Sequence, residues 1–128
     1  MLGSVLSIAA GASLGALLRW VLAVRFNPMY PALPLGTLAA NLVGGYIIGI
    51  AIAYFAWRPD VPPEVRLFVI TGFLGGLTTF STFSAEVVTQ LQQGAVLPAL
   101  VTAASHMLGS FALTALGIAT VAWLRQST

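Results

Sequence analysis

The sequence predicts an all-α membrane protein, with four transmembrane helices in a single integral-membrane domain, residues 1–128. The chain is 59% hydrophobic and only 6% charged, whereas a soluble domain usually has about a quarter of its residues charged. The apolar residues form four stretches, each longer than the roughly 20 residues that cross the hydrocarbon of a bilayer. Tryptophan and tyrosine residues lie at the ends of these stretches, where interfacial aromatic side chains are common.

The four predicted helices cover residues 2–24, 35–57, 65–91 and 96–124. The first has no basic residue before Arg19. A secretory signal carries positive charge ahead of its apolar part, so we expect a retained membrane helix. Proline-rich segments at 27–34 and 58–64 separate the first three helices, and the sequence QQG at 92–94 precedes the fourth. Pro98 falls in the first turn of the fourth helix, where proline is tolerated.

The arginines give little preference for one orientation in the membrane. Four spans place both termini on one side, together with Arg58, Arg66 and Arg125, and leave Arg19 and Arg25 on the other. Orientation follows the imbalance of Lys and Arg, and this imbalance is small. The sequence therefore predicts insertion in both orientations and antiparallel pairing of two copies. The alternative is a single orientation, set by the arginines on the side of the termini.

Glycines spaced four residues apart favour close helix packing. The pairs are Gly11 and Gly15, Gly45 and Gly49, and Gly72 and Gly76. Small residues at this spacing let helix backbones approach closely in lipid. A single copy with four helices is also small for surrounding a path through the membrane. The glycine pairs therefore favour an oligomer.

The composition excludes several classes of function. Cysteine is absent, which excludes disulfides and thiolate metal sites. No basic patch is present to bind nucleic acid. With one histidine, three scattered acids and no hydrolytic motif, the sequence indicates a protein that is not an enzyme.

The third predicted helix carries a cluster of glycines where we expect mid-membrane. Gly72, Gly75 and Gly76 lie within five residues, and each glycine costs about 1 kcal/mol in a helix interior. These glycines favour a broken helix, whose freed carbonyls could coordinate a small cation. Thr78 or Thr79 could cap the half-helix that restarts. The alternative is an unbroken helix with a glycine packing face.

The segment TFSTFS, residues 79–84, combines phenyl rings with hydroxyl groups. Phe80 and Phe83 are three residues apart and share a helix face. Because the edge of a phenyl ring is positive, two rings presented edge-on could hold an anion. The hydroxyls of Ser81, Thr82 and Ser84 could donate hydrogen bonds to that anion, which would stay bound weakly enough to leave. The alternative is that both rings form ordinary apolar surface.

Polar side chains on the second and fourth helices suggest further contacts. Asn41 lies near the middle of the second helix, and its NH2 group can donate two hydrogen bonds to an anion. On the fourth helix His106, Ser110 and Thr114 are spaced four apart and form one polar stripe. The alternative for Asn41 and His106 is hydrogen bonding between helices, and Ser110 and Thr114 could instead bond to the backbone of their own helix.

Two charged residues inside predicted spans are also candidates. Glu86 is the only acid well within a span, and an ionisable residue there is a functional candidate. Arg19 could attract anions at a vestibule, or its side chain could snorkel to the membrane interface.

Three segments together identify a family. GGLTTFSTFS at residues 75–84, GTLAANLVGG at 36–45 and GASLGALLRW at 11–20 resemble the Fluc/CrcB family of bacterial fluoride channels. The resemblance covers essentially the whole chain. It implies passive export of cytoplasmic fluoride down its electrochemical gradient, and hence fluoride resistance. It also implies a bacterial inner-membrane location and an antiparallel, dual-topology homodimer with two fluoride pathways.

The resemblance assigns roles to individual residues. Phe80 and Phe83 match the phenylalanine positions of the pathways, and Asn41 matches the pore asparagine. A central structural sodium ion is implied at the dimer interface, held by the main-chain carbonyls of Gly75 and Thr78. The remaining implied positions are a polar lining of Ser81, Thr82, Ser84 and Ser110, and a vestibule acid, Glu86.

Two other functions remain open on the residues alone. Small multidrug-resistance exporters are also short, four-helical and of dual topology, but they use an acid in the first helix, and residues 2–18 contain none. A non-transporting assembly subunit would have no need for so many hydroxyl groups in its spans.

Overall fold

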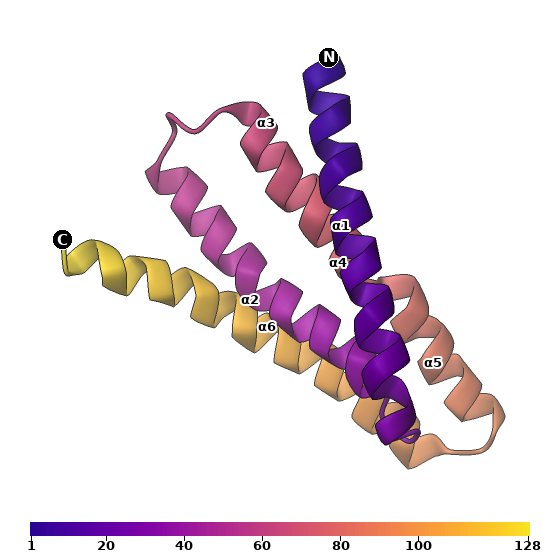
Figure 1. Ribbon diagram of the computed structural model, residues 1–128. Coiled ribbons are helices and arrows are strands. Elements are labelled where there is room, and N and C mark those ends of the chain that lie inside the picture. Colours follow the sequence, from indigo (N-terminus) through magenta and orange to yellow (C-terminus); the bar gives the residue numbers. More distant parts are fainter.

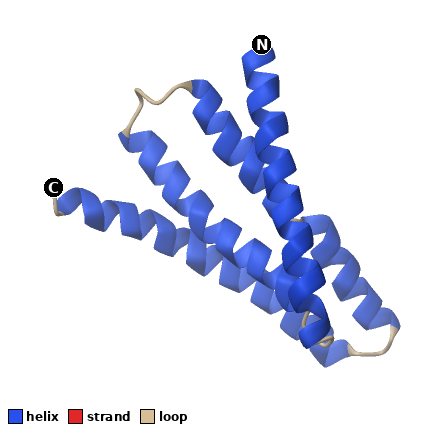
Figure 2. Ribbon diagram, in the orientation of Figure 1, coloured by secondary structure: helices blue, strands red, loops and turns tan.

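The computed structural model describes residues 1–128 and is helical apart from short connections (Figure 2). The elements are α1 (Leu2–Phe26), η1 (Asn27–Met29), α2 (Leu35–Trp57), α3 (Pro63–Arg66), η2 (Leu67–Leu74), α4 (Gly75–Leu77), α5 (Phe80–Gln92) and α6 (Val96–Gln126). Four segments are long and apolar enough to cross a membrane: Leu2–Met29, Leu35–Trp57, Pro63–Gln92 and Val96–Gln126. The predicted all-helical, four-span architecture is confirmed.

Helix ends extend slightly beyond the apolar stretches. α1 continues to Phe26 and α6 to Gln126, whereas the expected ends were residues 24 and 124. The third span begins at Pro63 rather than residue 65, because proline is well suited to the first helical turn. Gly94, which follows α5, has a φ of +74°. Glycine adopts this left-handed conformation without a Cβ penalty, so it ends the helix where the sequence predicts.

Two pairs of helices form the fold (Figure 1). α2 packs along α6, and α1 packs along η2 and α4. The pairs diverge toward the end that holds both termini and the α2–α3 connection. They converge at the other end, where α1 leads into α2 and α5 leads into α6. Both termini therefore lie at the same end, as four spans require.

Glycines allow the backbones within each pair to come close. A Cβ at Gly15 of α1 would collide with the Phe73 carbonyl of η2, and one at Gly49 of α2 would collide with the Thr114 carbonyl of α6. The other glycines of the predicted pairs also face backbone or side chains of this same chain. The expectation that these pairs join separate copies is therefore wrong, because the fold uses them internally.

The third span is interrupted at Thr78 and Thr79. Their ψ angles of 153° and 118° are extended rather than helical, and they fall near the middle of the Pro63–Gln92 segment. The preceding η2 is π-helical, a form that is rare and often found at functional sites. The predicted break in the helix is confirmed, and its depth in a bilayer stays a prediction.

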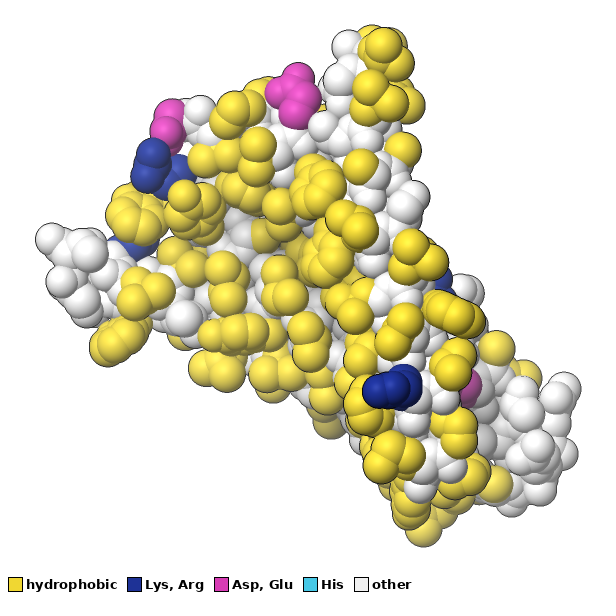
Figure 3. All heavy atoms as spheres, viewed as in Figure 1, with side chains coloured by type: hydrophobic (Ala, Val, Ile, Leu, Met, Phe, Trp, Pro, Cys, Tyr) yellow, Lys and Arg dark blue, Asp and Glu magenta, His cyan; other side chains and the backbone are white.

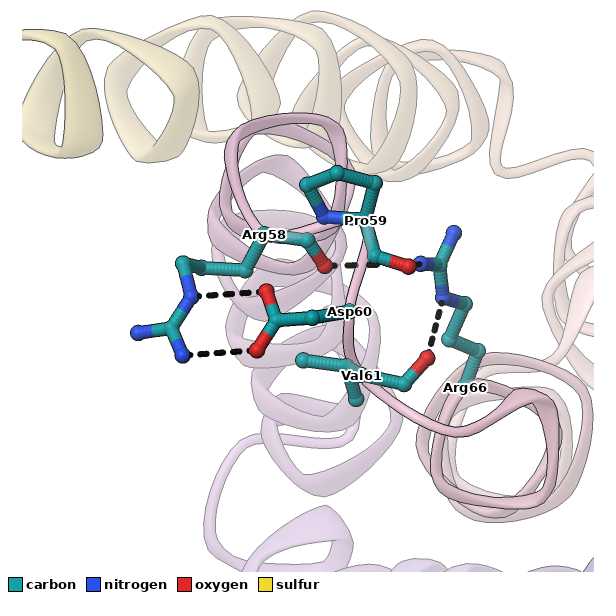
Figure 4. Close-up of polar contacts among 5 residues, drawn as sticks. All are labelled: Arg58, Pro59, Asp60, Val61 and Arg66. Atoms are coloured by element: carbon teal, nitrogen blue, oxygen red, sulfur yellow. Dashed lines mark hydrogen bonds and ion pairs between the residues drawn. The ribbon is translucent and has the colours of Figure 1, made fainter.

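The α2–α3 connection is held by two arginines (Figure 4). Arg58 makes two hydrogen bonds to the Asp60 carboxylate, of 2.9 and 2.8 Å. These hydrogen bonds lower the pKa of Asp60 to about 2 and raise the pKa of Arg58, so both groups are charged at neutral pH. Arg66 donates to the carbonyls of Pro59 at 2.9 Å and Val61 at 3.3 Å. The connection is thus fixed by side chains as well as by its prolines.

Apolar side chains cover most of the surface in Figure 3, and the few charged groups lie mainly toward the two ends. Many large hydrophobic residues are exposed, among them Leu97, Leu108 and Phe111 on α6. Such a surface suits lipid or another apolar partner rather than water.

Candidate functional site

A groove of about 490 Å³ lies beside the break in the third span. It is bordered by α2, by η2 and α4, by the start of α5 and by α6. It brings together eight of the predicted site residues: Asn41, Gly75, Thr78, Phe80, Phe83, His106, Ser110 and Thr114. The predicted residues outside its lining are Arg19, Ser81, Thr82, Ser84 and Glu86.

Asn41 holds the break in place. Its Oδ1 accepts from the Thr79 N–H at 2.8 Å, and its Nδ2 donates to the Thr79 carbonyl at 3.0 Å. The same Nδ2 lies 2.9 Å from Nδ1 of His106. Both amide hydrogens therefore have protein partners. In this structure Asn41 forms hydrogen bonds between helices, which was the alternative to its predicted role as a donor to an anion.

Local capping explains how the helix ends and restarts. The Leu74 carbonyl at the end of η2 accepts both the Thr78 N–H at 3.0 Å and the Thr78 hydroxyl at 2.8 Å. The Thr79 hydroxyl oxygen accepts from the Thr82 N–H at 3.1 Å, so Thr79 is the N-cap of α5. The expectation that one of these threonines caps the restarting helix is confirmed.

The break withdraws the helical donors from two carbonyls. In a continuous helix the Gly75 carbonyl would accept from the Thr79 N–H, and the Thr78 carbonyl from the Thr82 N–H. Those N–H groups instead donate to Asn41 Oδ1 and Thr79 Oγ1. Gly75 is exposed, and a Cβ built on it would have no neighbour closer than 3.8 Å. Both carbonyls belong to residues that line the groove.

Arg19 takes the place of a helical donor at a third carbonyl. Its Nε donates to the Gly76 carbonyl at 3.0 Å, which a continuous helix would pair with the Phe80 N–H. The guanidinium thus lies at the C-terminal end of α4, where the helix dipole favours positive charge. The Arg19 side chain bonds to this acceptor within the chain, and its role at a vestibule or at the membrane interface stays a prediction.

The two phenylalanines form an edge-to-face pair. Their ring centroids are 5.5 Å apart and the planes meet at 83°. Phe83 is 7% exposed and stacks on the ring of His106, with centroids 4.4 Å apart and planes at 20°. Phe80 is 77% exposed and faces the open side of the groove. His106 thus covers one face of Phe83.

The polar stripe of α6 also reaches the groove. His106, Ser110 and Thr114 all contribute to its lining, as their spacing predicts. Thr114 donates its hydroxyl hydrogen to the Gly45 carbonyl at 2.9 Å, which ties α6 to α2. That hydrogen is not available to an anion, whereas no such bond engages the Ser110 hydroxyl.

The remaining hydroxyls of α5 lie around its first two turns. The Ser81 hydroxyl lies 3.2 Å from the Thr79 hydroxyl, so one donates to the other. Thr82 and Ser84 are partly buried. Neither they nor Ser81 line the groove, so a role for them in the same path stays a prediction.

Glu86 belongs to a separate hydrogen-bonded group. Its Oε1 accepts from the Thr37 hydroxyl at 2.7 Å. Asn27 of η1 in turn accepts from the Thr37 N–H at 3.0 Å and donates to the Thr37 hydroxyl at 3.1 Å. Sequence reasoning did not assign Asn27 or Thr37. The position of Thr37 four residues before Asn41 could have placed both on one face of α2.

Several buried polar atoms between α5 and α6 have no partner within the protein. They include Glu86 Oε2, Thr102 Oγ1 and His106 Nε2. Glu86 is one turn beyond Phe83, and Thr102 is one turn before His106. Because the two helices run antiparallel and Phe83 stacks on His106, these atoms lie at similar levels. Buried polar atoms normally have partners, which can be ordered water. Thr102 was not predicted.

The structure contains no cluster of three or more His, Cys, Asp or Glu residues that could hold a metal ion. A metal ligand set here would have to come from main-chain oxygens.

Comparison with known proteins identifies the family of the chain. Residues 6–118 match the family described as CrcB-like protein, Camphor Resistance (CrcB). A protein of Tolumonas auensis named fluoride-specific ion channel FluC is 60% identical over 127 residues, covering 99% of this chain and all of that protein. Proteins with the same name from Burkholderia lata and Chromobacterium violaceum are 62% and 60% identical. The two alignments cover 97% and 96% of this chain, and each covers 98% of the relative's own length. These relatives and the four apolar helices show a multi-pass membrane protein, and the chain belongs to the CrcB-like family.

Proposed function

We propose that this chain forms a fluoride-selective, passive ion channel that exports fluoride down its electrochemical gradient. Relatives at about 60% identity over nearly the whole chain bear the name fluoride-specific ion channel. The observation that carries the proposal is the groove, which gathers Phe80, Phe83, Asn41 and Ser110 beside a helix break. Ion paths in membranes are typically found where irregular backbone lines a cavity.

The groove offers weak contacts to a small anion. The Ser110 hydroxyl can donate a hydrogen bond, and the edges of Phe80 and Phe83 present partial positive charge. No Lys or Arg lines the groove, so no charged side chain would trap an anion. Conduction needs binding of this moderate strength.

A second copy of the chain would close the groove. Phe80 is 77% exposed in the single chain, and Phe111 beside it is 65% exposed. We propose an antiparallel homodimer, in which each copy covers the groove of the other and two pathways result. Dual topology in the membrane supplies the two orientations.

A sodium ion fits the carbonyls at the break. Gly75 and Thr78 lose their helical donors to Asn41 and Thr79, and hard cations prefer oxygen ligands. One chain supplies only these two carbonyls, so the site needs the same pair from the second copy. The ion would supply positive charge that fixes the two breaks against one another.

The proposed location is the bacterial inner membrane, and the proposed benefit is fluoride resistance. Fluoride enters cells as neutral hydrogen fluoride from acidic surroundings and ionises inside. The anion is then trapped because it does not cross lipid. A passive pore releases it without a coupling ion.

The test is efflux from liposomes. The purified protein is reconstituted with internal fluoride or internal chloride, without a proton gradient, and efflux is followed with ion-selective electrodes. We expect rapid fluoride efflux and no chloride efflux above protein-free liposomes. Efflux that appears only when a proton gradient is imposed would support the exporter alternative. No fluoride efflux from folded protein under either condition would refute transport of fluoride.

A further inference from the structure

We propose that His106 is a positioning residue, which holds the Asn41 amide on the backbone of the helix break by accepting a hydrogen bond at Nδ1. The inference deepens the proposed function and rests on it where flux is concerned. It assigns a role to the one histidine of the chain.

The hydrogen bonds of Asn41 fix the protonation of the His106 ring. The Thr79 N–H can only donate and the Thr79 carbonyl can only accept, so Oδ1 and Nδ2 of Asn41 can be told apart. The second hydrogen of Nδ2 then points to Nδ1 of His106 at 2.9 Å. A nitrogen that accepts this hydrogen carries a lone pair. In a neutral imidazole the proton is therefore on Nε2.

The surroundings hold the His106 ring in this orientation. The residue is 3% exposed, and its ring stacks on Phe83 with centroids 4.4 Å apart. The ring thus links Phe83 of α5 to Asn41 of α2, and through Asn41 to Thr79 at the break. Without the Nδ1 acceptor, one N–H of the partly buried Asn41 amide would lose its protein partner, which costs free energy. The amide would then be held by its two bonds to Thr79 alone, and its orientation at the break would be less well fixed.

The first test reads the tautomer directly. Because the chain has a single histidine, full-length protein labelled with ¹⁵N-histidine, and purified through a tag without histidine, gives the NMR signals of His106 alone. We expect one protonated nitrogen, Nε2, and one unprotonated nitrogen, Nδ1, at neutral pH. Asn41→Leu should shift the Nδ1 signal. A proton on Nδ1, or a fully protonated ring, would overturn the proposal.

The second test separates the acceptor from the ring. His106→Asn retains an acceptor oxygen near the position of Nδ1. His106→Leu has a side chain with the same branching and number of heavy atoms as asparagine, but it has no acceptor. Loss of one hydrogen bond to a buried group predicts fluoride efflux about tenfold slower for the Leu variant than for the Asn variant. His106→Phe, which retains the ring alone, should be as slow as the Leu variant. Equal rates for Asn and Leu, or a wild-type rate for Phe, would overturn the positioning role.

The two tests fail in distinguishable ways. Wild-type protein with no fluoride efflux would refute the proposed function, while the ¹⁵N spectrum would still decide whether His106 accepts from Asn41. If size-exclusion chromatography shows that the His106 variants do not fold, the wild-type tautomer decides the proposal.

Discussion

Most hydrogen-bond donors around the groove already have protein acceptors. The Asn41 amide donates to the Thr79 carbonyl and to His106 Nδ1. The Thr78 hydroxyl donates to the Leu74 carbonyl, and the Thr114 hydroxyl donates to the Gly45 carbonyl. An anion in the groove would therefore depend on the Ser110 hydroxyl and on ring edges. At the residue scale this makes the phenylalanines more important than the polar stripe suggests.

Phe80→Ile tests that dependence. Isoleucine retains apolar bulk but has no positive ring edge, and 1.4 kcal/mol of lost interaction corresponds to about a tenfold change. We expect fluoride efflux from liposomes to fall by about tenfold, while size-exclusion chromatography shows that the assembled protein is retained. Phe26→Ile, at the exposed end of α1, is the matched control. Unchanged efflux in Phe80→Ile would contradict the edge-on role.

Spacing along the sequence predicts the residues of the groove better than it predicts their partners. Phe80 with Phe83, and His106 with Ser110, share faces because of helical periodicity. The bonds of Asn41 to Thr79 and His106 join residues from different helices, so they depend on how α2 crosses the break. No periodicity in a single helix contains that information.

At the scale of elements, the end of α4 depends on a side chain from another helix. Arg19 donates to the Gly76 carbonyl, and Arg19→Leu would leave this partly buried acceptor without a donor. We expect a loss of stability of about 1–3 kcal/mol, measured as a lower midpoint of thermal unfolding in detergent. Arg19→Lys, which retains a donor, should lose less. Arg25→Leu, at the exposed last turn of α1, should change little, and an equal loss there would show a general effect of charge removal.

Close packing of α1 on η2 gives a second test. A Cβ at Gly15 would collide with the Phe73 carbonyl, whereas one at Gly3 has its nearest neighbour at 3.9 Å. Overpacking of this kind costs about 1–3 kcal/mol, so Gly15→Ala should lower the unfolding midpoint. Gly3→Ala should leave it unchanged or raise it slightly, because alanine favours the helix. A stable Gly15→Ala variant would mean that the two helices can separate without cost.

Hydropathy and prolines predict the four spans almost to the residue, since apolar length and chain breakers are local properties. They do not predict the π-helical form of η2, which packs against α1. The glycine pairs were correctly read as close-packing sites but assigned to contacts between copies. Spacing shows that a helix can be approached closely, and it does not show by which helix.

At the scale of the whole molecule, the fold changes the count of charges at the two ends. Arg58, Arg66 and Arg125 lie at the end of the molecule that holds the termini, and Arg25 lies toward the other end. Arg19 is bonded to Gly76 inside the protein, so it contributes less to the opposite end than the sequence suggests. The arginine imbalance is therefore larger than predicted, although an antiparallel dimer requires both orientations in equal number.

Labelling of a single cysteine measures the orientations. The chain has no cysteine, and Thr128→Cys places one at the exposed C-terminal residue. In spheroplasts treated with a membrane-impermeant maleimide, dual topology predicts that about half of the chains are labelled before lysis and the rest only after it. Phe26→Arg adds a positive charge at the other end and should shift this ratio if arginine balance sets orientation. Labelling of nearly all or nearly none of the chains before lysis would mean a single orientation. The groove would then have no antiparallel copy to close it, and the proposed pathways would need a different cover.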